Sequence, residues 1–231
     1  MTTILAIETS RSLCSVAVQR NAELVEDTRK VERLHNEVVL EMIDDVCRAA
    51  EIARRAFDVV AFAAGPGSFT GVRIAAAVAQ GIAFGADARI VPVSSSRAMA
   101  CSAINALTAS PSRIITMTRS RADAYYLAGY LREGDSLNLE VDDVLCTQWP
   151  AELLQVDWLA VGDRPPWWPS VPRSVGWGGG VAVTAATIAA LGLAEFAAGT
   201  AVAPSAGLPR YVSGDSPWVK SGRKTTAPRN S

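Results

Sequence analysis

The feature that most constrains this chain is a predicted helix over residues 69–84 that has almost no polar face. Between positions 72 and 84 only Arg73, Gln80 and Gly81 interrupt a run of Val, Ile, Ala and Phe. A helix that is apolar all round must be covered on every side. A sheet of the same chain can cover one side, so the sequence predicts that a second domain or a partner subunit covers another. Burial entirely within this chain is the alternative.

The segment before this helix is the most informative loop in the sequence. Residues 58–64 (DVVAFAA) read as a strand buried on both faces, and GPGSFTG (65–71) joins that strand to the helix. Backbone N–H groups and the positive end of a helix at such a junction favour an anion. The loop is neither a Walker A loop, because no Lys-Ser/Thr follows, nor a GxGxxG fingerprint, because its third glycine comes one residue late. The sequence allows two roles for this loop, a tight turn or a phosphate-binding loop.

A second polar turn follows the first predicted strand. The first predicted strand ends at Glu8, Thr9 and Ser10. A carboxylate at this position can orient a metal-bound phosphate or cap the turn. The candidate nucleotide or phosphate contacts are therefore Glu8, Thr9, Ser10, Gly65, Gly67 and Ser68.

Hydrophobic periodicity predicts an α/β fold in two parts. The first part contains strands over 3–7, 13–19, 23–29, 58–64 and 89–93 and helices over 35–52, 69–84 and 94–107. The second contains strands over 113–117, 124–130 and 157–161 and a helix over 181–196. We expect an N-terminal subdomain over 1–106, a C-terminal subdomain over 107–219, and a basic, disordered tail over 220–231.

The residue counts argue against several functions. With 22 Lys and Arg against 23 Asp and Glu, the chain lacks the basic surplus of a protein that grips nucleic acid by itself. His35 is the only histidine, which excludes a two-histidine metal site. Ser68 does not lie in a G-x-S-x-G elbow. We therefore predict no catalytic residue and no metal ligand.

The expected location is the cytoplasm, without a membrane. Four cysteines lie far apart in the sequence, as is typical of reduced thiols, and the N-terminus lacks the basic region of a signal peptide. Residues 174–194 carry no charge, but their glycine run and two threonines favour a loop followed by a buried helix.

Motifs spread over most of the chain resemble those of the TsaB family, which takes part in tRNA threonylcarbamoyladenosine synthesis. They are ILAIETSRSLCSVAV (4–18), His35 at the start of a helix, AAGPGSFTGVRIAAAVAQGIAF (63–84), PVSSSRAMA (92–100) and LPRYVSGDSPWVK (208–220). The resemblance implies an actin/Hsp70-like (ASKHA) fold with two related subdomains, each a mixed sheet with flanking helices. Glu8 stands where the family usually has Asp.

The resemblance also implies a role as the inactive paralogue and partner of TsaD, the subunit that transfers threonylcarbamoyl to N6 of the tRNA adenosine beside the anticodon. It further implies binding of the ATPase TsaE, and it leaves open ATP or ADP at the complex interface. The charge balance favours tRNA contact only through the complex, and an apolar face without its partner favours a homodimer when TsaD is absent. The expected partner contacts are His35, Val38, Met42, Val46, Val72, Ile74 and Val78.

Two rival functions remain open. One is a nucleotide-binding phosphotransferase of the same fold that uses Glu8 and the 65–71 loop. The other is a peptidase that cleaves its partner and uses Ser68 and His35.

Overall fold

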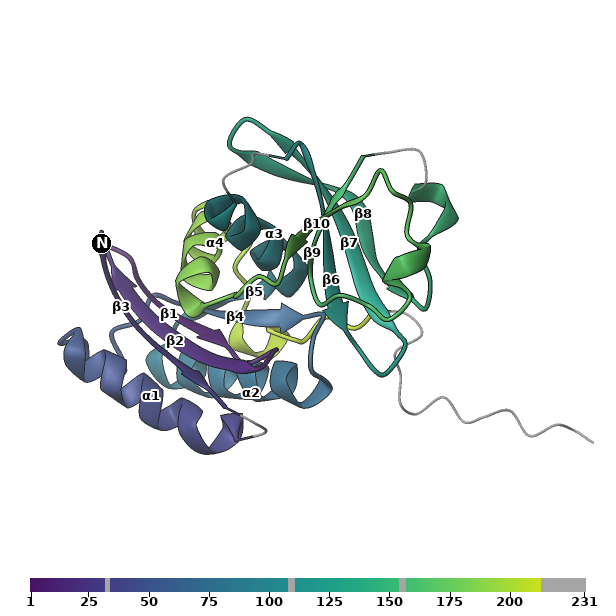
Figure 1. The fold of residues 1–231 in the computed structure, drawn as a ribbon. Helices are drawn as coiled ribbons and strands as arrows, with labels where there is room; N and C mark the ends of the chain where they lie inside the picture. The colour runs from purple at the N-terminus through teal and green to yellow at the C-terminus, as the bar shows by residue number, and fades with distance from the viewer. Residues whose placement is uncertain (32–33, 108–110, 154–156, 213–231) are drawn as a thin grey trace, which may run out of the picture.

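The computed structural model describes residues 1–31, 34–107, 111–153 and 157–212. These residues form two mixed five-stranded sheets with helices packed on them (Figure 1). The predicted α/β architecture, with two sheets and flanking helices, is confirmed. The expected tail over 220–231 lies outside the described residues.

The first sheet has the strand order β3-β2-β1-β4-β5. Strands β1 (Thr3–Glu8), β2 (Leu13–Arg20) and β3 (Glu23–Lys30) form an antiparallel meander. Strands β4 (Val59–Gly65) and β5 (Arg89–Ser94) run parallel to β1, with Ile4 opposite Val59.

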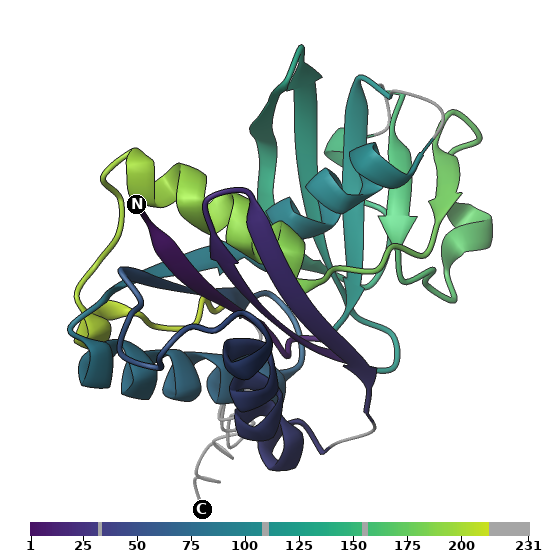
Figure 2. The same ribbon diagram turned by 90° about the vertical axis from the view of Figure 1, so that its left-hand side faces the viewer.

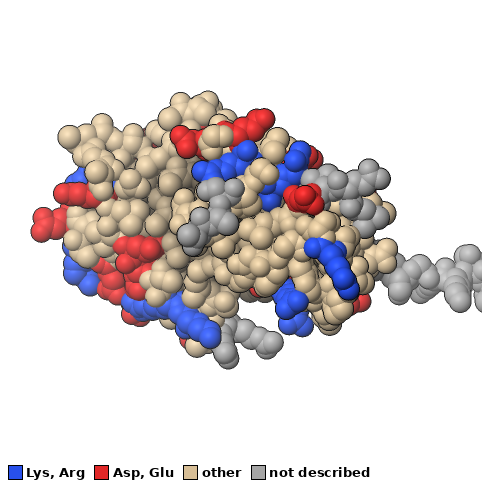
Figure 3. Space-filling view, turned by 45° about the horizontal axis from the view of Figure 1, so that its top comes forward, with Lys and Arg blue, Asp and Glu red and all other residues tan. Residues whose placement is uncertain are grey.

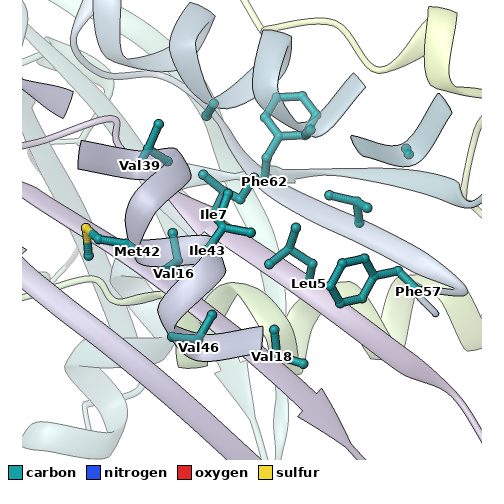
Figure 4. Packing of buried hydrophobic residues seen from close by; sticks show 14 of the residues in the cluster. Leu5, Ile7, Val16, Val18, Val39, Met42, Ile43, Val46, Phe57 and Phe62 are labelled. Atoms are coloured by element: carbon teal, nitrogen blue, oxygen red, sulfur yellow. The ribbon is translucent and has the colours of Figure 1, made fainter. Parts of the chain in front are cut away.

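Helices α1 (His35–Ala49) and α2 (Phe69–Ala86) cover one face of this sheet (Figure 1). Side chains alternate between the two faces of a strand, so Leu5 and Ile7 of β1 point to the α1–α2 side. Figure 4 shows Ile7 beside Ile43 of α1 and Phe62 of β4, and Leu5 beside Ile43 and Phe57. This layer is the first hydrophobic core.

Helices α3 (Ser95–Ala106) and α4 (Ala185–Ala197) lie between the two sheets (Figure 2). The opposite face of β1, with Ile4 and Ala6, packs against α4. Close approach requires Gly192 of α4, because a Cβ there would come within 2.5 Å of the Ala61 side chain. Helix α4 therefore packs on the first sheet, although it follows the expected boundary at residue 106 in the sequence. How the chain divides into subdomains stays a prediction.

The second sheet has the order β10-β9-β6-β7-β8. Its strands are β6 (Arg113–Arg119), β7 (Tyr125–Glu133), β8 (Ser136–Cys146), β9 (Leu159–Gly162) and β10 (Gly176–Gly179). Hydrophobic periodicity does not mark β8, which is largely exposed and acidic, or β10, whose glycines are typical of a loop. Both form strands because a neighbouring strand supplies their hydrogen bonds.

Loops and short 3-10 helices cover the outer face of the second sheet. The 3-10 helices η1 (Ala151–Leu153) and η2 (Trp168–Ser170) belong to this layer, and η3 (Pro204–Ala206) lies beside α2 and β5. Trp149 and Trp158 are buried there against Met117 of β6. These large rings fill the space that a helix occupies on the other face.

Candidate functional site

The loop between β4 and α2 is held by the turn between β1 and β2. The Ser68 N–H donates to the Ser10 carbonyl oxygen at 2.8 Å. The Thr9 hydroxyl donates to the Gly71 carbonyl oxygen at 2.8 Å. Ser68 also caps α2, because its Oγ accepts from the Gly71 N–H at 3.2 Å. These contacts join two segments that are about sixty residues apart in the sequence.

Two glycines of the loop are required by this close contact. A Cβ on Gly67 would lie 2.7 Å from the Ser10 carbonyl oxygen. A Cβ on Gly71 would overlap the Thr9 carbonyl oxygen. The glycine pattern of the loop is therefore explained by packing of the two turns against each other.

Glu8 is fully buried behind the same turn. Its Oε1 accepts from the Ser10 N–H at 2.5 Å, and its Oε2 has no hydrogen-bond partner among the described residues. Burial raises the pKa of Glu8 to about 7, against the opposing effect of the Ser10 hydrogen bonds and the charge of Arg11. Glu8 is therefore partly protonated near neutral pH.

The six candidate phosphate contacts differ in accessibility. Glu8, Thr9, Ser10 and Gly65 are buried, Gly67 is half-buried and Ser68 is exposed. The N–H groups of Ser68 and Gly71 already donate within the protein. The geometry explains these residues as a structural junction, and a phosphate contact here stays a prediction.

The same junction reaches the second sheet through Arg11. Its guanidinium forms an ion pair with Asp163 at 2.6 Å and donates to the Thr118 hydroxyl at 3.0 Å. Asp163 also accepts from the Arg119 N–H at 2.9 Å. A cavity of about 350 Å³ lies between these groups and Ser68. Sequence reasoning missed Arg11 and Asp163, because no local pattern marks two residues 152 positions apart as a pair.

A cavity of about 500 Å³ lies between the first turns of α1 and α2. Its lining includes Arg11, His35, Ser68 and Ile74. His35 is 9% exposed, and its Nε2 has no hydrogen-bond partner among the described residues. Within the described chain, no hydrogen bond joins Ser68 to His35, and no cluster of three His, Cys, Asp or Glu residues is placed to hold a metal ion. A serine nucleophile activated by His35 has no support in this geometry.

Helix α2 leaves an apolar surface facing solvent, which we call the α2 outer face. Its exposed residues lie on one side of the helix, at intervals close to one or two helical turns: Thr70, Ala77, Gly81, Phe84 and Gly85. Phe84 is 82% exposed, and a Cβ on Gly81 or Gly85 would meet no atom within 4 Å.

Helix α2 is also the one helix in the described part of the chain that is long and apolar enough to cross a membrane by length and composition. Six of its residues are nevertheless buried, and the helix packs along β4, as the core helix of a folded domain does.

Comparisons with known proteins identify the family. The model of a family described as "TsaD: tRNA N6-adenosine threonylcarbamoyltransferase" matches residues 27–163. The tRNA threonylcarbamoyladenosine biosynthesis protein TsaB of Escherichia coli is 30% identical over 226 residues, which cover 94% of this chain and 97% of that protein. The chain belongs to the TsaB family.

Other TsaB-family matches agree. TsaB of Haemophilus influenzae is 37% identical over 131 residues, which cover 57% of this chain and 55% of that protein. The solved structure of YeaZ from Pseudomonas aeruginosa is 27% identical, with a TM-score of 0.77, and the match covers 92% of this chain and all of that one. Another structure from that organism, described as having similarity to the peptidase YeaZ, is 29% identical with a TM-score of 0.82 and the same coverage.

Six of the seven partner contacts expected from the sequence divide into two groups, and the seventh, His35, is buried beside the cavity between α1 and α2. Met42, Val46 and Val72 are at most 3% exposed and belong to the core of this chain; Figure 4 shows Met42 and Val46 on the side of α1 that packs on the sheet. Val38, Ile74 and Val78 are half-buried at the edge of that core. The sequence pattern predicted an amphipathic helix for α1 and an apolar helix for α2, but it did not separate the residues in the core from those at its edge.

Proposed function

We propose that this chain is a non-catalytic scaffold subunit. It binds TsaD, activates it for threonylcarbamoyl transfer to N6 of the tRNA adenosine beside the anticodon, and recruits the ATPase TsaE. Membership of the TsaB family supports this role, because the curated relatives are named for tRNA threonylcarbamoyladenosine biosynthesis.

The observation that carries the proposal is the α2 outer face. A largely apolar helix face in contact with water is unfavourable, and exposed apolar surfaces of this kind mark sites of protein association. Phe84 is a large side chain that a partner pocket can bury. Gly81, Gly85 and Ala77 have little or no side chain, so a partner helix can approach α2 closely.

The residues of the proposed interface differ from those expected from the sequence. It comprises the α2 outer face with the half-buried Val38, Ile74 and Val78 along its margin, and His35 lies beside the cavity between α1 and α2. The interface depends indirectly on three core residues that hold α1 and α2 on the sheet, namely Met42, Val46 and Val72. When TsaD is absent, the same face pairs with a second copy of this chain.

The charge distribution supports indirect rather than direct contact with tRNA. On the face shown in Figure 3, the described basic and acidic side chains lie beside one another and form no broad basic patch. Phosphate contacts supply most of the affinity of a nucleic-acid-binding surface. We therefore assign tRNA binding to the complex. The proposal also includes ATP or ADP at the interface of the complex and a cytoplasmic location.

The test is co-expression with TsaD of the same organism, followed by size-exclusion chromatography with light scattering. Ala77→Glu places a charge at the centre of the α2 outer face without entering the core. Ala190→Glu, at an exposed position of α4, is the matched control. An unpaired charge buried in an interface costs about 3–5 kcal/mol, which weakens binding more than 100-fold.

Wild type and Ala190→Glu are expected to elute as heterodimers with TsaD, and Ala77→Glu is expected to elute alone. If all three proteins elute alone with TsaE and nucleotide present, the scaffold role is wrong. If Ala77→Glu still forms the heterodimer, the role survives but the α2 outer face is not its interface.

A further inference from the structure

The side chain of Arg73 in α2 is held between two aromatic rings. Its guanidinium carbon lies 3.3 Å from the centre of the Phe69 ring and 4.9 Å from the centre of the Tyr211 ring. Its Nη1 donates to the Phe69 carbonyl oxygen at 2.7 Å. A guanidinium over the face of an aromatic ring is attracted to the electrons of that ring. We call these three residues the Arg73 stack.

Tyr211 belongs to the C-terminal segment, which is fixed beside α2. The Arg210 N–H donates to the Ala64 carbonyl oxygen of β4 at 2.7 Å. The Gln80 side chain of α2 donates to the Gly207 carbonyl oxygen at 3.1 Å. Figure 2 shows η3, which directly precedes this segment, beside α2. The residues before Tyr211 therefore hold its ring in place at the guanidinium.

The Arg73 stack is open to solvent. Phe69 is 43% exposed, Tyr211 is 60% exposed and Arg73 is half-buried. Among the described residues Arg73 forms no ion pair, and its guanidinium donates only to the Phe69 carbonyl oxygen. No nitrogen of Arg73 is both buried and unpaired, so its other N–H donors reach the surface. A guanidinium has five N–H donors, and most of those on Arg73 are available to a partner.

The charges near the stack favour an anion. Phe69 lines the cavity of about 350 Å³ in which Arg11 is paired with Asp163. Arg119 lines the same cavity, and like Arg73 it forms no ion pair with a described residue. Helix α2 contains no acidic residue, and the positive end of its dipole lies on this side. Two guanidinium groups without a carboxylate therefore lie near the start of α2.

Arg73 also lies on the margin of the α2 outer face. It is four positions before Ala77 and eleven positions, or about three helical turns, before Phe84, so these side chains follow one line along the helix. The α2 outer face itself is apolar and consists mostly of small residues, which leaves a partner helix free to slide along it. A charged contact at one end fixes the register of such an interface.

We propose that the Arg73 stack binds a carboxylate side chain of TsaD and so fixes the position of TsaD along α2. The inference rests on the proposed scaffold role and names the group that makes this interface selective. The carboxylate lies about three helical turns from the TsaD pocket that covers Phe84, and it accepts from the exposed guanidinium donors. A second copy of this chain that pairs through α2 brings no carboxylate on that helix. Arg73 therefore favours TsaD over self-pairing.

The experiment is titration of the full chain with TsaD of the same organism, without nucleotide, at ionic strengths from about 0.05 to about 0.5 M. Arg73→Gln removes the charge, and it is expected to weaken TsaD binding by about tenfold or more and to reduce its salt dependence. Arg73→Lys keeps the charge but not the planar set of donors, and its affinity should lie between the two. Arg132→Gln is the matched control and should bind as the wild type does. Arg132 is half-buried in β7, donates to a backbone carbonyl oxygen and forms no ion pair with a described residue.

Two further measurements separate partner selection from support of the fold. Arg73→Gln should self-associate as the wild type does in analytical ultracentrifugation, because the carboxylate that it has lost belongs to TsaD. Tyr211→Leu removes one ring of the stack without changing α2, so it tests the stack even if Arg73→Gln does not fold. It should also weaken TsaD binding, most strongly at low salt.

The outcomes distinguish this inference from the scaffold role. If the wild type does not bind TsaD, the scaffold role is wrong and the carboxylate contact with it. If the wild type binds and folded Arg73→Gln and Tyr211→Leu variants match it in affinity and salt dependence, only the carboxylate contact is wrong. Equal weakening of TsaD binding and of self-association overturns the proposal as well. So does a loss seen only when the titrations are repeated with ADP, because Arg73 then contacts the nucleotide.

Discussion

Replacement of Gly71 by Ala is expected to unfold the junction between β1 and α2. Gly71 lies in the first turn of α2, directly over the turn between β1 and β2. The added Cβ would overlap the Thr9 carbonyl oxygen and lie 3.0 Å from its carbonyl carbon. Both atoms belong to the backbone, so the clash is not relieved by a side-chain rotation, and α2 must move away from the turn.

The expected cost combines three effects. Overpacking of a buried contact costs about 3 kcal/mol when backbone must move. Separation of the two segments breaks the Thr9–Gly71 hydrogen bond, which contributes about 1 kcal/mol. The higher helix propensity of Ala returns about 1 kcal/mol. The net loss of unfolding free energy is therefore about 3 kcal/mol.

The measurement is urea unfolding followed by circular dichroism, at a concentration where light scattering shows a monomer. Gly81→Ala is the matched control on the same helix, because a Cβ there meets no atom within 4 Å. It should stabilise the free chain by about 0.5–1 kcal/mol through helix propensity alone. The two variants should therefore differ by about 4 kcal/mol, and a Gly71→Ala variant within about 0.5 kcal/mol of the wild type would refute the packing explanation of the loop.

Three further predictions concern the interface, a buried carboxyl and the link between the sheets. Phe84→Ala should weaken TsaD binding by about 2 kcal/mol, or about thirtyfold in a titration. It should leave the unfolding free energy of the free chain within about 0.5 kcal/mol of the wild type, because this ring is exposed until a partner covers it. Unchanged affinity for TsaD would contradict the proposed interface. The folded state keeps a proton on Glu8 that the unfolded state releases, so the unfolding free energy of the wild type should fall by up to about 3 kcal/mol as the pH rises from 4.5 to about 7. Burial of Asp143 and Glu195 acts in the same direction, so the diagnostic is the difference in urea unfolding between wild type and Glu8→Gln across that range, and parallel pH profiles would show that Glu8 does not titrate there. A double-mutant cycle of Arg11→Gln and Asp163→Asn should give a coupling energy of about 1 kcal/mol, since the pair is close but partly exposed, and additive losses would mean that the ion pair does not help to hold the two sheets together.

Much of the first sheet and its helices could be predicted from local patterns. Alternation over β1 and β2, and the continuous apolar run of β4, depend only on which neighbours in the sequence are apolar. The sequence of α2 showed that this helix has too few polar residues to form a solvent-facing side opposite the side that packs on the sheet. Its 13 consecutive positions from 72 to 84 contain so few polar residues that the existence of a face needing cover follows from composition alone.

The sequence could not show which apolar residues of α1 and α2 lie in the core and which lie at its edge. Met42, Val46 and Val72 are as apolar as Val38 and Val78, and periodicity treats all of them alike. Only packing on β2 and β4 shows that the first three belong to the core. The same limit applies to β10, where Gly176–Gly179 has little strand propensity and becomes a strand because β9 offers a parallel partner.

Local periodicity and motifs of contiguous residues were therefore sufficient to predict the α/β architecture and the family, and they indicated a helix that needs cover on more than one side. The tertiary structure decided that the glycine loop is a packing junction, that Phe84 and Gly81 face solvent, and that Arg11 meets Asp163. It also brought Tyr211 to Arg73. Each of these facts depends on contacts between residues far apart in the chain, and such contacts exist only after the two sheets and their helices have assembled.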